Sequence, residues 1–365
     1  MLLVLQLELQ LSTDPIYDFL FLFQDNTIAG MITTQRKILR PLFSIAKILI
    51  AIVLLWLLVH SAQINVKLFI TLIQQPFIFF AVILFFLLVV VGGAWRWSIL
   101  NSAQGIDLGF YKSVFVAYVG SAFNNLLPSA LGGDFIRLFY VFKQAPQKKN
   151  EALLVMFSDR FLGFLAIFIT ISLVSIIDVH IFYRQPRIFY LFLGCAAFCI
   201  GTLIAFVFGI WLSHRIQLDA WLNKKLGHKT WSKPVIAFFK TLGMFRLEKW
   251  VIVKGLMISV ALQLLMAFII MVISNMMGLP ALAFSNFIIA MGAIQIVNLI
   301  PITPGGIGIG EIAFANILLM LNPGVTGAYA TALLAYRLIS MLAYLPGLMG
   351  FIYKFRFSKE SLLPA

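Results

Sequence analysis

Two short stretches of the chain decide its fold, because each interrupts a long apolar segment with proline and glycine. The first reads Asn125-Leu-Leu-Pro-Ser-Ala-Leu-Gly-Gly133, and the second reads Asn298-Leu-Ile-Pro-Ile-Thr-Pro-Gly-Gly306. Asn, Leu, Pro, Gly and Gly stand at the same places in both, at an offset of 173 (298 − 125). Proline removes a helical hydrogen bond and glycine loosens the backbone. The sequence therefore predicts two hairpins of broken helices, over 110–142 and 284–322.

The composition around these stretches is that of a membrane protein. The chain has 365 residues, of which 62% are hydrophobic and 11% are charged, and its mean hydropathy is +1.02. Soluble domains carry about 25% charged residues, so a chain this apolar needs lipid to cover its surface. The apolar runs are continuous rather than alternating, which excludes an outer-membrane barrel.

Six apolar runs approach or exceed the roughly 20 residues that a helix needs to cross a bilayer. The sequence thus predicts an all-α polytopic membrane protein with about six full transmembrane helices and two re-entrant broken hairpins. The six predicted spans are 41–60, 77–97, 152–177, 188–212, 251–277 and 327–353.

Basic residues outnumber acidic ones by 27 to 13, which gives a formal net charge of +14. They stand in short loops beside the spans, where such residues orient a membrane protein, so we do not expect nucleic acid as a partner. The segment 213–250 is rich in Lys and Arg and contains Trp and Leu, which favours an amphipathic helix on anionic lipid at the cytoplasmic face. Together with the basic loop 143–150, it predicts that both termini are cytoplasmic. A bacterial inner (cytoplasmic) membrane is the default location that we expect for such a helical bundle.

We expect one transmembrane domain, over 41–355, with a short tail at each end. Residues 1–40 form an N-terminal tail and 356–365 a C-terminal tail. Residues 1–30 contain no Lys or Arg, unlike a signal peptide. We expect them to be poorly ordered, or the native chain to start at Met31.

The domain contains an internal repeat with halves at about 77–177 and 251–353. Arg160-Phe-Leu-Gly-Phe-Leu-Ala166 matches Arg337-Leu-Ile-Ser-Met-Leu-Ala343 at an offset of 177 (337 − 160). The first hairpin is expected to open inside and the second outside, which makes the repeat inverted, as in many transporters. Backbone freed at the breaks must be buried or line a wet cavity. These broken-helix positions are Pro128, Gly132, Gly133, Pro301, Pro304, Gly305, Gly306 and Gly308.

Charged residues beside the breaks form the candidate site. A charge at bilayer depth costs about 2.5–3.5 kcal/mol on insertion scales, so such side chains face inward and pair with one another. The set predicted to handle a lipid headgroup is Asn125, Asp134, Arg137, Asp159, Arg160, Asn298, Glu311 and Arg337.

Two interpretations of these charges stay open at this point. Asp134 and Glu311 stand where they could cap the returning half-helices. Arg160 and Arg337 present planar donor forks that suit phosphate or carboxylate, which points to an anionic ligand. The alternative for the arginines is an internal salt bridge, such as Arg337 with Glu311.

The sequence shows no convincing catalytic set, and we expect no metal and no cofactor. Ser-His-Asp, HExxH and Walker patterns are not found in it. The Gly-rich run 306–311 follows Pro304 in a broken hairpin rather than a strand, which argues against a nucleotide loop. Cys195 and Cys199 stand in an apolar run, where packing is the simplest role.

Four motifs together resemble the flippase-like family of the lysylphosphatidylglycerol synthase transmembrane region. They are NNLLPSALGGDFIR (124–137), SDRFLG (158–163), PITPGGIGIGE (301–311) and YRLIS (336–340). The resemblance covers about residues 40–355 and implies a headgroup-site role for the matching residues Asp134, Arg137, Arg160, Glu311 and Arg337. In bifunctional relatives of the multiple peptide resistance factor type, this region moves aminoacylated phosphatidylglycerol between leaflets.

The resemblance implies a lipid transporter for an anionic or modified phospholipid, such as aminoacyl-phosphatidylglycerol, or for a polyprenyl-phosphate-linked lipid. Aminoacyl transfer belongs to a separate C-terminal domain in those relatives, so we do not expect this chain to be an enzyme. Membrane lipids are the expected partners; a homo-oligomer or a lipid-synthase partner stays open. The alternatives are an accessory subunit of a lipid or cell-envelope synthase, and a membrane-embedded headgroup transferase.

Overall fold

All regular secondary structure is helical in the part that the computed structural model describes. This part comprises residues 67–126, 132–177, 249–298, 303 and 306–360, with isolated positions between 190 and 204. Four helices in these ranges are long and apolar enough to cross a membrane: α5 (Pro76–Ala103), α8 (Lys149–Ile177), α13 (Lys249–Met276) and α16 (Tyr329–Glu360). They confirm a polytopic α-helical membrane protein. The predicted span 41–60, most of 188–212 and nearly all of 213–250 lie outside the described residues, as do both tails apart from 356–360.

Two pairs of shorter helices stand where the broken hairpins are predicted. The first pair is α6 (Phe110–Leu126) and α7 (Gly132–Gln144), and the second is α14 (Phe284–Val297) and α15 (Ile309–Leu321). The helices of each pair pack against each other. A short helix α4 (Lys67–Ile73) precedes α5, and a 3-10 turn η2 (Pro146–Lys148) links α7 to α8.

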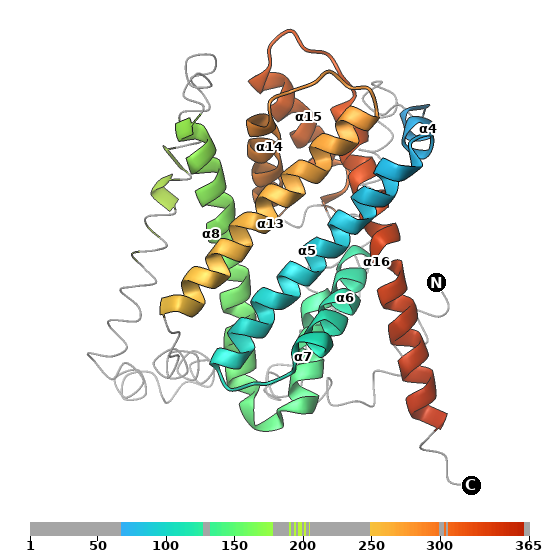
Figure 1. The fold of residues 1–365 in the computed structure, drawn as a ribbon. Helices are drawn as coiled ribbons and strands as arrows, with labels where there is room; N and C mark the ends of the chain where they lie inside the picture. The colour runs from blue at the N-terminus through green and yellow to red at the C-terminus, as the bar shows by residue number, and fades with distance from the viewer. Residues whose placement is uncertain are drawn as a thin grey trace, which may run out of the picture. The chain divides into compact units, whose positions relative to one another are not determined.

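The packing of the helices follows the predicted repeat. Helices α5 and α13 begin at 76 and 249 and end at 103 and 276, so both ends keep the offset of 173 (249 − 76 and 276 − 103). Among these eight helices, exchanging α5–α8 with α13–α16 turns every observed packing into an observed packing. For example, α6 packs on α16, and α14 packs on α8. In Figure 1, α6 and α7 lie toward the lower end of α5, whereas α14 and α15 lie toward the upper end of α13. These relations support the predicted inverted repeat, whose orientation in a membrane stays a prediction.

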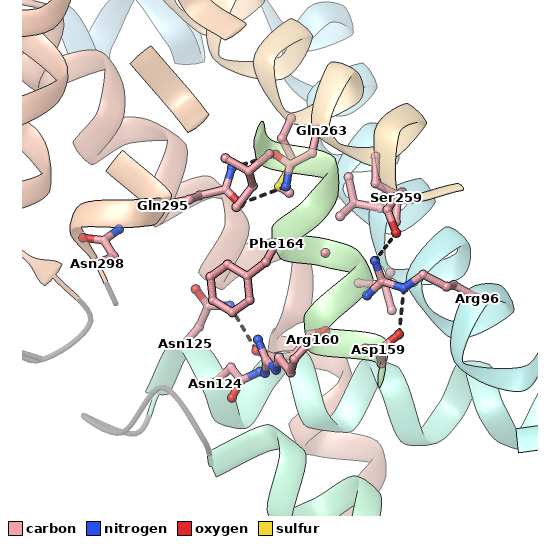
Figure 2. A pocket seen from close by; sticks show the side chains of 18 of the residues that line it. Arg96, Asn124, Asn125, Asp159, Arg160, Phe164, Ser259, Gln263, Gln295 and Asn298 are labelled. Carbon is pink, nitrogen blue, oxygen red and sulfur yellow. Dashed lines mark hydrogen bonds and ion pairs between the residues drawn. The ribbon is translucent and has the colours of Figure 1, made fainter. Parts of the chain in front are cut away.

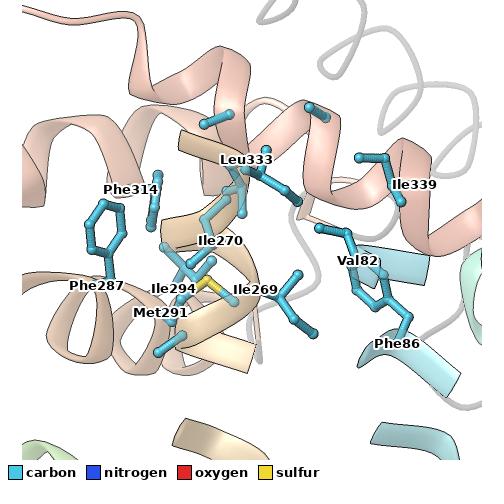
Figure 3. Close-up of a cluster of buried hydrophobic side chains, with 14 of the residues drawn as sticks. Val82, Phe86, Ile269, Ile270, Phe287, Met291, Ile294, Phe314, Leu333 and Ile339 are labelled. Carbon is cyan, nitrogen blue, oxygen red and sulfur yellow. The ribbon is translucent and has the colours of Figure 1, made fainter. Parts of the chain in front are cut away.

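The largest apolar core joins the two halves. It brings together side chains of α5, α13, α14, α15 and α16, including Phe86, Ile269, Phe287, Phe314 and Leu333 (Figure 3), all of which are almost completely buried. In lipid, close van der Waals packing of this kind stabilises helix association. By contrast, apolar side chains on the outer side of α5, such as Phe77 and Leu84, are exposed, as expected for a lipid-facing surface.

Glycine sets the spacing inside the first hairpin. A Cβ added at Gly133 would overlap the carbonyl oxygen of Gly120, so α6 and α7 approach each other where neither has a side chain. The backbone N–H of Gly133 donates to Oδ1 of Asn124 at 2.7 Å. The predicted break therefore ends in a tight helix contact that places the following charged residues.

Candidate functional site

A cavity of about 470 Å³ lies between the two halves of the repeat, beside the first hairpin. Figure 2 shows that side chains from several helices converge on it. Its polar lining consists of Arg96, Ser121, Asn124, Asn125, Arg137, Asp159, Arg160, Ser259, Gln263, Gln295 and Asn298. Apolar side chains of α5, α8 and α13, with Tyr344 of α16, complete the wall.

Asp159 of α8 is the centre of the charged part of this cavity. Its Oδ1 accepts a hydrogen bond of 2.7 Å from Nε of Arg96, and its Oδ2 lies 3.8 Å from Nη1 of Arg137. Arg96 also donates from Nη1 to Oγ of Ser259 at 2.7 Å. One buried carboxylate thus holds two arginines, one from α5 and one from α7.

Arg137 lies over an aromatic ring and keeps one donor unused. Its Cζ lies 5.9 Å from the ring centroid of Trp97, within the range of a cation–π interaction. Its Nε is buried and has no hydrogen-bond partner among the side chains and backbone that the structure describes. Because an unpaired buried donor is costly, this nitrogen still needs an acceptor.

Arg160 and Arg337, which match in the repeat, both bind carboxylates, but in different surroundings. Arg160 donates from Nε to Oδ2 of Asp134 at 2.8 Å, and Nε of Arg337 lies 3.0 Å from Oε1 of Glu311. The Arg160 side chain is 47% exposed and lines the cavity, whereas that of Arg337 is 15% exposed and is not part of its lining. The internal salt bridge considered for Arg337 is therefore present, and only Arg160 of the two faces the cavity.

Glu311 also caps its helix, which was the structural role considered for it. Its Oε2 accepts a hydrogen bond of 2.6 Å from the backbone N–H of Gly308, at the start of α15. Gly306 and Gly308 adopt φ of +70° and +87°, a left-handed region that glycine tolerates best. Nη2 of Arg337 donates to the carbonyl of Gly306 at 3.2 Å, which ties α16 to the same turn.

Amide side chains form the rest of the polar wall. Gln263 of α13 and Gln295 of α14 bind each other reciprocally, with Nε2-to-Oε1 distances of 3.1 and 2.7 Å. Asn125 donates from Nδ2 to the carbonyl of Ser121 at 3.0 Å. Oδ1 of Asn298 is buried and accepts no hydrogen bond from any described group.

An apolar crevice of about 370 Å³ adjoins the cavity. It lies between α6 and α16, and its lining is Ala122, Asn125, Leu338, Met341, Leu342, Tyr344 and Leu345. Asn125 and Tyr344 line both the crevice and the charged cavity. A polar chamber and an apolar chamber therefore share a boundary.

The structure brings most of the predicted site residues together. Asn125, Arg137, Asp159, Arg160 and Asn298 line the cavity. Three others stand outside its lining: Asp134 behind Arg160, and Glu311 with Arg337 at the second hairpin. Of the broken-helix positions, Gly132 and Gly133 begin α7, while Pro128, Pro301, Pro304 and Gly305 lie outside the described residues. Within the described part of the chain, no group of His, Cys, Asp and Glu could hold a metal ion.

The sequence analysis missed six polar residues of the cavity wall, which are Arg96, Ser121, Asn124, Ser259, Gln263 and Gln295. Arg96 stands near the end of a predicted span, where arginine ordinarily anchors a helix at the interface. Ser259 and Gln263 are four residues apart, which places them on one face of α13. That polar pair inside an apolar span was an available signal of an inward-facing surface.

Comparison with known proteins agrees with this architecture. Residues 44–347 match the family model described as "Lysylphosphatidylglycerol synthase TM region". The chain belongs to this family. A relative named "UPF0104 membrane protein", from Methanothermobacter thermautotrophicus, is 26% identical over 233 residues, which is 58% of this chain. The match spans 66% of the length of that relative, slightly under two thirds.

In this member of the lysylphosphatidylglycerol synthase TM region family, the two halves are unequal in charge. At the repeat offsets of 173 and 177, Arg96, Arg137 and Asp159 correspond to Ile269, Phe314 and Tyr336 (96 + 173, 137 + 177, 159 + 177). Ile269 and Phe314 are fully buried in the apolar core, and Tyr336 packs against it. The ion pair of Arg160 recurs in the second half, whereas the cluster around Asp159 belongs to the first half alone.

Proposed function

We propose that the protein is a flippase-like lipid transporter that moves an anionic or phosphate-bearing lipid between the leaflets of a bacterial cytoplasmic membrane. The substrates considered are a phospholipid, a modified phosphatidylglycerol and a polyprenyl-phosphate-linked lipid. The observation that carries the proposal is the shared boundary of the charged cavity and the apolar crevice at Asn125 and Tyr344. A lipid has a polar headgroup and apolar chains, and these two adjoining chambers fit the two parts.

The charges of the cavity suit a phosphate. Arg96, Arg137 and Arg160 line it with Asp159, so cationic side chains predominate in the lining. Guanidinium groups bind phosphate oxygens through two parallel hydrogen bonds. Arg137 and Arg160 both line the cavity, and the Arg160 side chain is 47% exposed, so it has donors available to a headgroup.

The repeat supplies a mechanism for moving the headgroup. Broken helices meet near the middle of such folds, and rocking of one half against the other exposes the site to each side in turn. Here the headgroup would occupy the cavity while the acyl chains leave through the crevice between α6 and α16 and stay in lipid. The movement would be driven by an ion gradient, by the membrane potential, or by downhill exchange of lipid.

Leaflet exchange in proteoliposomes tests the proposal. Phosphatidylglycerol with a fluorescent acyl chain is reconstituted with the purified chain, and dithionite quenching reports the fraction in the outer leaflet over time. Wild type is expected to exchange the probe, and Arg160→Ala and Arg137→Ala to slow exchange by about 10- to 100-fold, the loss expected for about 1.5–3 kcal/mol of charged hydrogen bonding.

The matched control is Lys112→Gln, which removes one positive charge at an exposed position on α6 outside the cavity. It is expected to exchange lipid like wild type. No exchange of phosphatidylglycerol or of a polyprenyl-phosphate probe, by protein that elutes as one folded species, would argue against transport and favour an accessory subunit. Chemical alteration of either lipid by the purified protein would favour a headgroup transferase.

A further inference from the structure

If the proposed function holds, the charge balance of the cavity indicates which kind of lipid headgroup it binds. Arg96, Arg137 and Arg160 contribute three positive charges. Asp159 in the lining and Asp134 behind Arg160 contribute two negative charges. These five side chains therefore leave one positive charge uncompensated in the described wall of the cavity.

Both carboxylates of this cluster are already engaged by arginine. Asp159 holds Arg96 at 2.7 Å and Arg137 at 3.8 Å, and Asp134 accepts from Arg160 at 2.8 Å. Asp159 and Asp134 are 4% and 3% exposed, so bound water can satisfy little of either. An ammonium group entering the cavity would have to displace an arginine from one of them, leaving a guanidinium unpaired.

The remaining polar wall is neutral and rich in amides. Asn124, Asn125, Gln263, Gln295 and Asn298 line the cavity, with the hydroxyls of Ser121 and Ser259. The buried Oδ1 of Asn298 accepts no hydrogen bond from any described group. Amide and hydroxyl groups both donate and accept, which suits sugar or glycerol hydroxyls.

We propose that the cavity selects a lipid whose headgroup joins one phosphodiester to an uncharged polyhydroxyl group, and that it discriminates against aminoacylated lipids. The phosphate lies beside Arg137 and Arg160, where its single negative charge balances the excess positive charge. The hydroxyls lie against the amide wall. A lysyl ester brings two ammonium groups to the same place, where they meet arginines at close range and like charges repel.

The test compares two lipids that differ only in the lysyl ester. Phosphatidylglycerol and lysylphosphatidylglycerol with the same fluorescent acyl chain are placed in phosphatidylcholine vesicles that contain the full chain. Wild type is expected to exchange phosphatidylglycerol at least about tenfold faster, which corresponds to about 1.4 kcal/mol. A fluorescent short-chain polyprenyl-phosphoryl hexose is run in parallel. Whether this lipid or phosphatidylglycerol exchanges faster tells which of the two lipid classes the cavity prefers.

Asn124→Asp is the sharpest variant for this test. It keeps the oxygen that accepts from the backbone N–H of Gly133 and adds one negative charge to the cavity wall. In this variant, the exchange rate of phosphatidylglycerol divided by that of lysylphosphatidylglycerol is expected to fall by at least about threefold. Asn150→Asp adds the same charge at an exposed position of α8 outside the cavity, and is expected to keep the wild-type ratio.

A second variant changes the same charge balance without touching the break. Ser259→Asp places a carboxylate beside Arg96 and is expected to shift the ratio in the same direction as Asn124→Asp. Exchange of lysylphosphatidylglycerol at or above the rate of phosphatidylglycerol by wild type would overturn this inference and leave the transporter function standing. Failure of all three lipids to exchange would instead contradict the proposed function itself.

Discussion

Arg160 on α8 reaches the first turn of α7 and donates from Nε to Oδ2 of Asp134 at 2.8 Å. This bond ties a full span to the returning arm of the first hairpin. Because the Arg160 side chain is 47% exposed and lines the cavity, the headgroup of the proposed lipid substrate would compete with Asp134 for it. In the proposed function, this contact would link occupation of the cavity to the position of the hairpin.

The ion pair of the second half gives the first prediction. Arg337→Gln leaves Glu311, which is fully buried, without its cation. Breaking a buried pair in this way is expected to lower the free energy of unfolding by about 3–5 kcal/mol. Arg160→Gln also leaves a buried carboxylate, that of Asp134, but is expected to cost less, because Arg160 borders the cavity and its shortening lets water approach Asp134. Thermal unfolding in detergent, followed by size-exclusion chromatography, compares the two variants.

The double variant Arg337→Gln with Glu311→Gln is the control for this prediction. It removes both charges while an amide oxygen can still accept from the N–H of Gly308. Much of the lost stability is expected to return. A double variant no more stable than Arg337→Gln would show that the pair contributes more than charge compensation.

Helix packing in the first hairpin gives the second prediction. Gly133→Ala places a methyl group against the carbonyl of Gly120 and is expected to destabilise the protein by about 1–3 kcal/mol, or to prevent folding. Gly93→Ala is the control, because a Cβ there meets no atom within 4 Å, and alanine favours the helix. Equal melting temperatures for the two variants would contradict the close approach of α6 and α7.

The crevice between α6 and α16 gives the third prediction. Leu342→Trp enlarges a half-exposed side chain that lines the crevice and is expected to slow exchange of a two-chain phospholipid by about tenfold or more. Binding of water-soluble glycerol phosphate to the cavity, measured by calorimetry in detergent, is expected to stay unchanged.

Leu84→Trp is the matched control, because Leu84 is similarly exposed on α5 but lines neither chamber. It is expected to exchange lipid at the wild-type rate. Undiminished exchange by Leu342→Trp would mean that the acyl chains leave by another route.

The reciprocal amides of Gln263 and Gln295 give the fourth prediction. A double-mutant cycle with alanine at each position is expected to yield a coupling energy of about 0.6–2 kcal/mol, the range measured for interhelical hydrogen bonds in membranes. Urea or thermal unfolding of the four proteins supplies the values. A coupling near zero would mean that the two side chains act independently of each other.

Sequence patterns predicted the broken helices because the physical signal there is local. Proline and glycine weaken a helix locally, so a cluster of them, as in 128–133, is a signal that needs no knowledge of the neighbouring helices. The pairing of Arg337 with Glu311 was one of the two interpretations left open by the sequence, since a charge in an apolar span needs a partner. Each of these features depends on a few residues, so it can be recognised in a single sequence.

The cavity itself could not be derived in the same way. Asp159 was predicted to face inward, but its main partner, Arg96, belongs to a span 63 residues earlier. Which of several arginines meets which carboxylate depends on helix rotation and crossing, and apolar periodicity constrains these weakly. Gln263 and Gln295 were missed for a related reason, because their function depends on the distance between two helices.

The unequal halves of the repeat have a practical consequence for genetics. Positions of the second half that correspond to the charged cluster are filled by Ile269, Phe314 and Tyr336, which belong to or pack against the apolar core. In a saturation mutagenesis screen, loss-of-function variants of the two halves should therefore differ in how much protein reaches the membrane. Loss-of-function variants near 96, 137 and 159 should accumulate to normal levels in the membrane, whereas those near 269, 314 and 336 should be depleted from it. The second half of the repeat would then mainly stabilise the protein, and the charged cluster of the first half would serve transport.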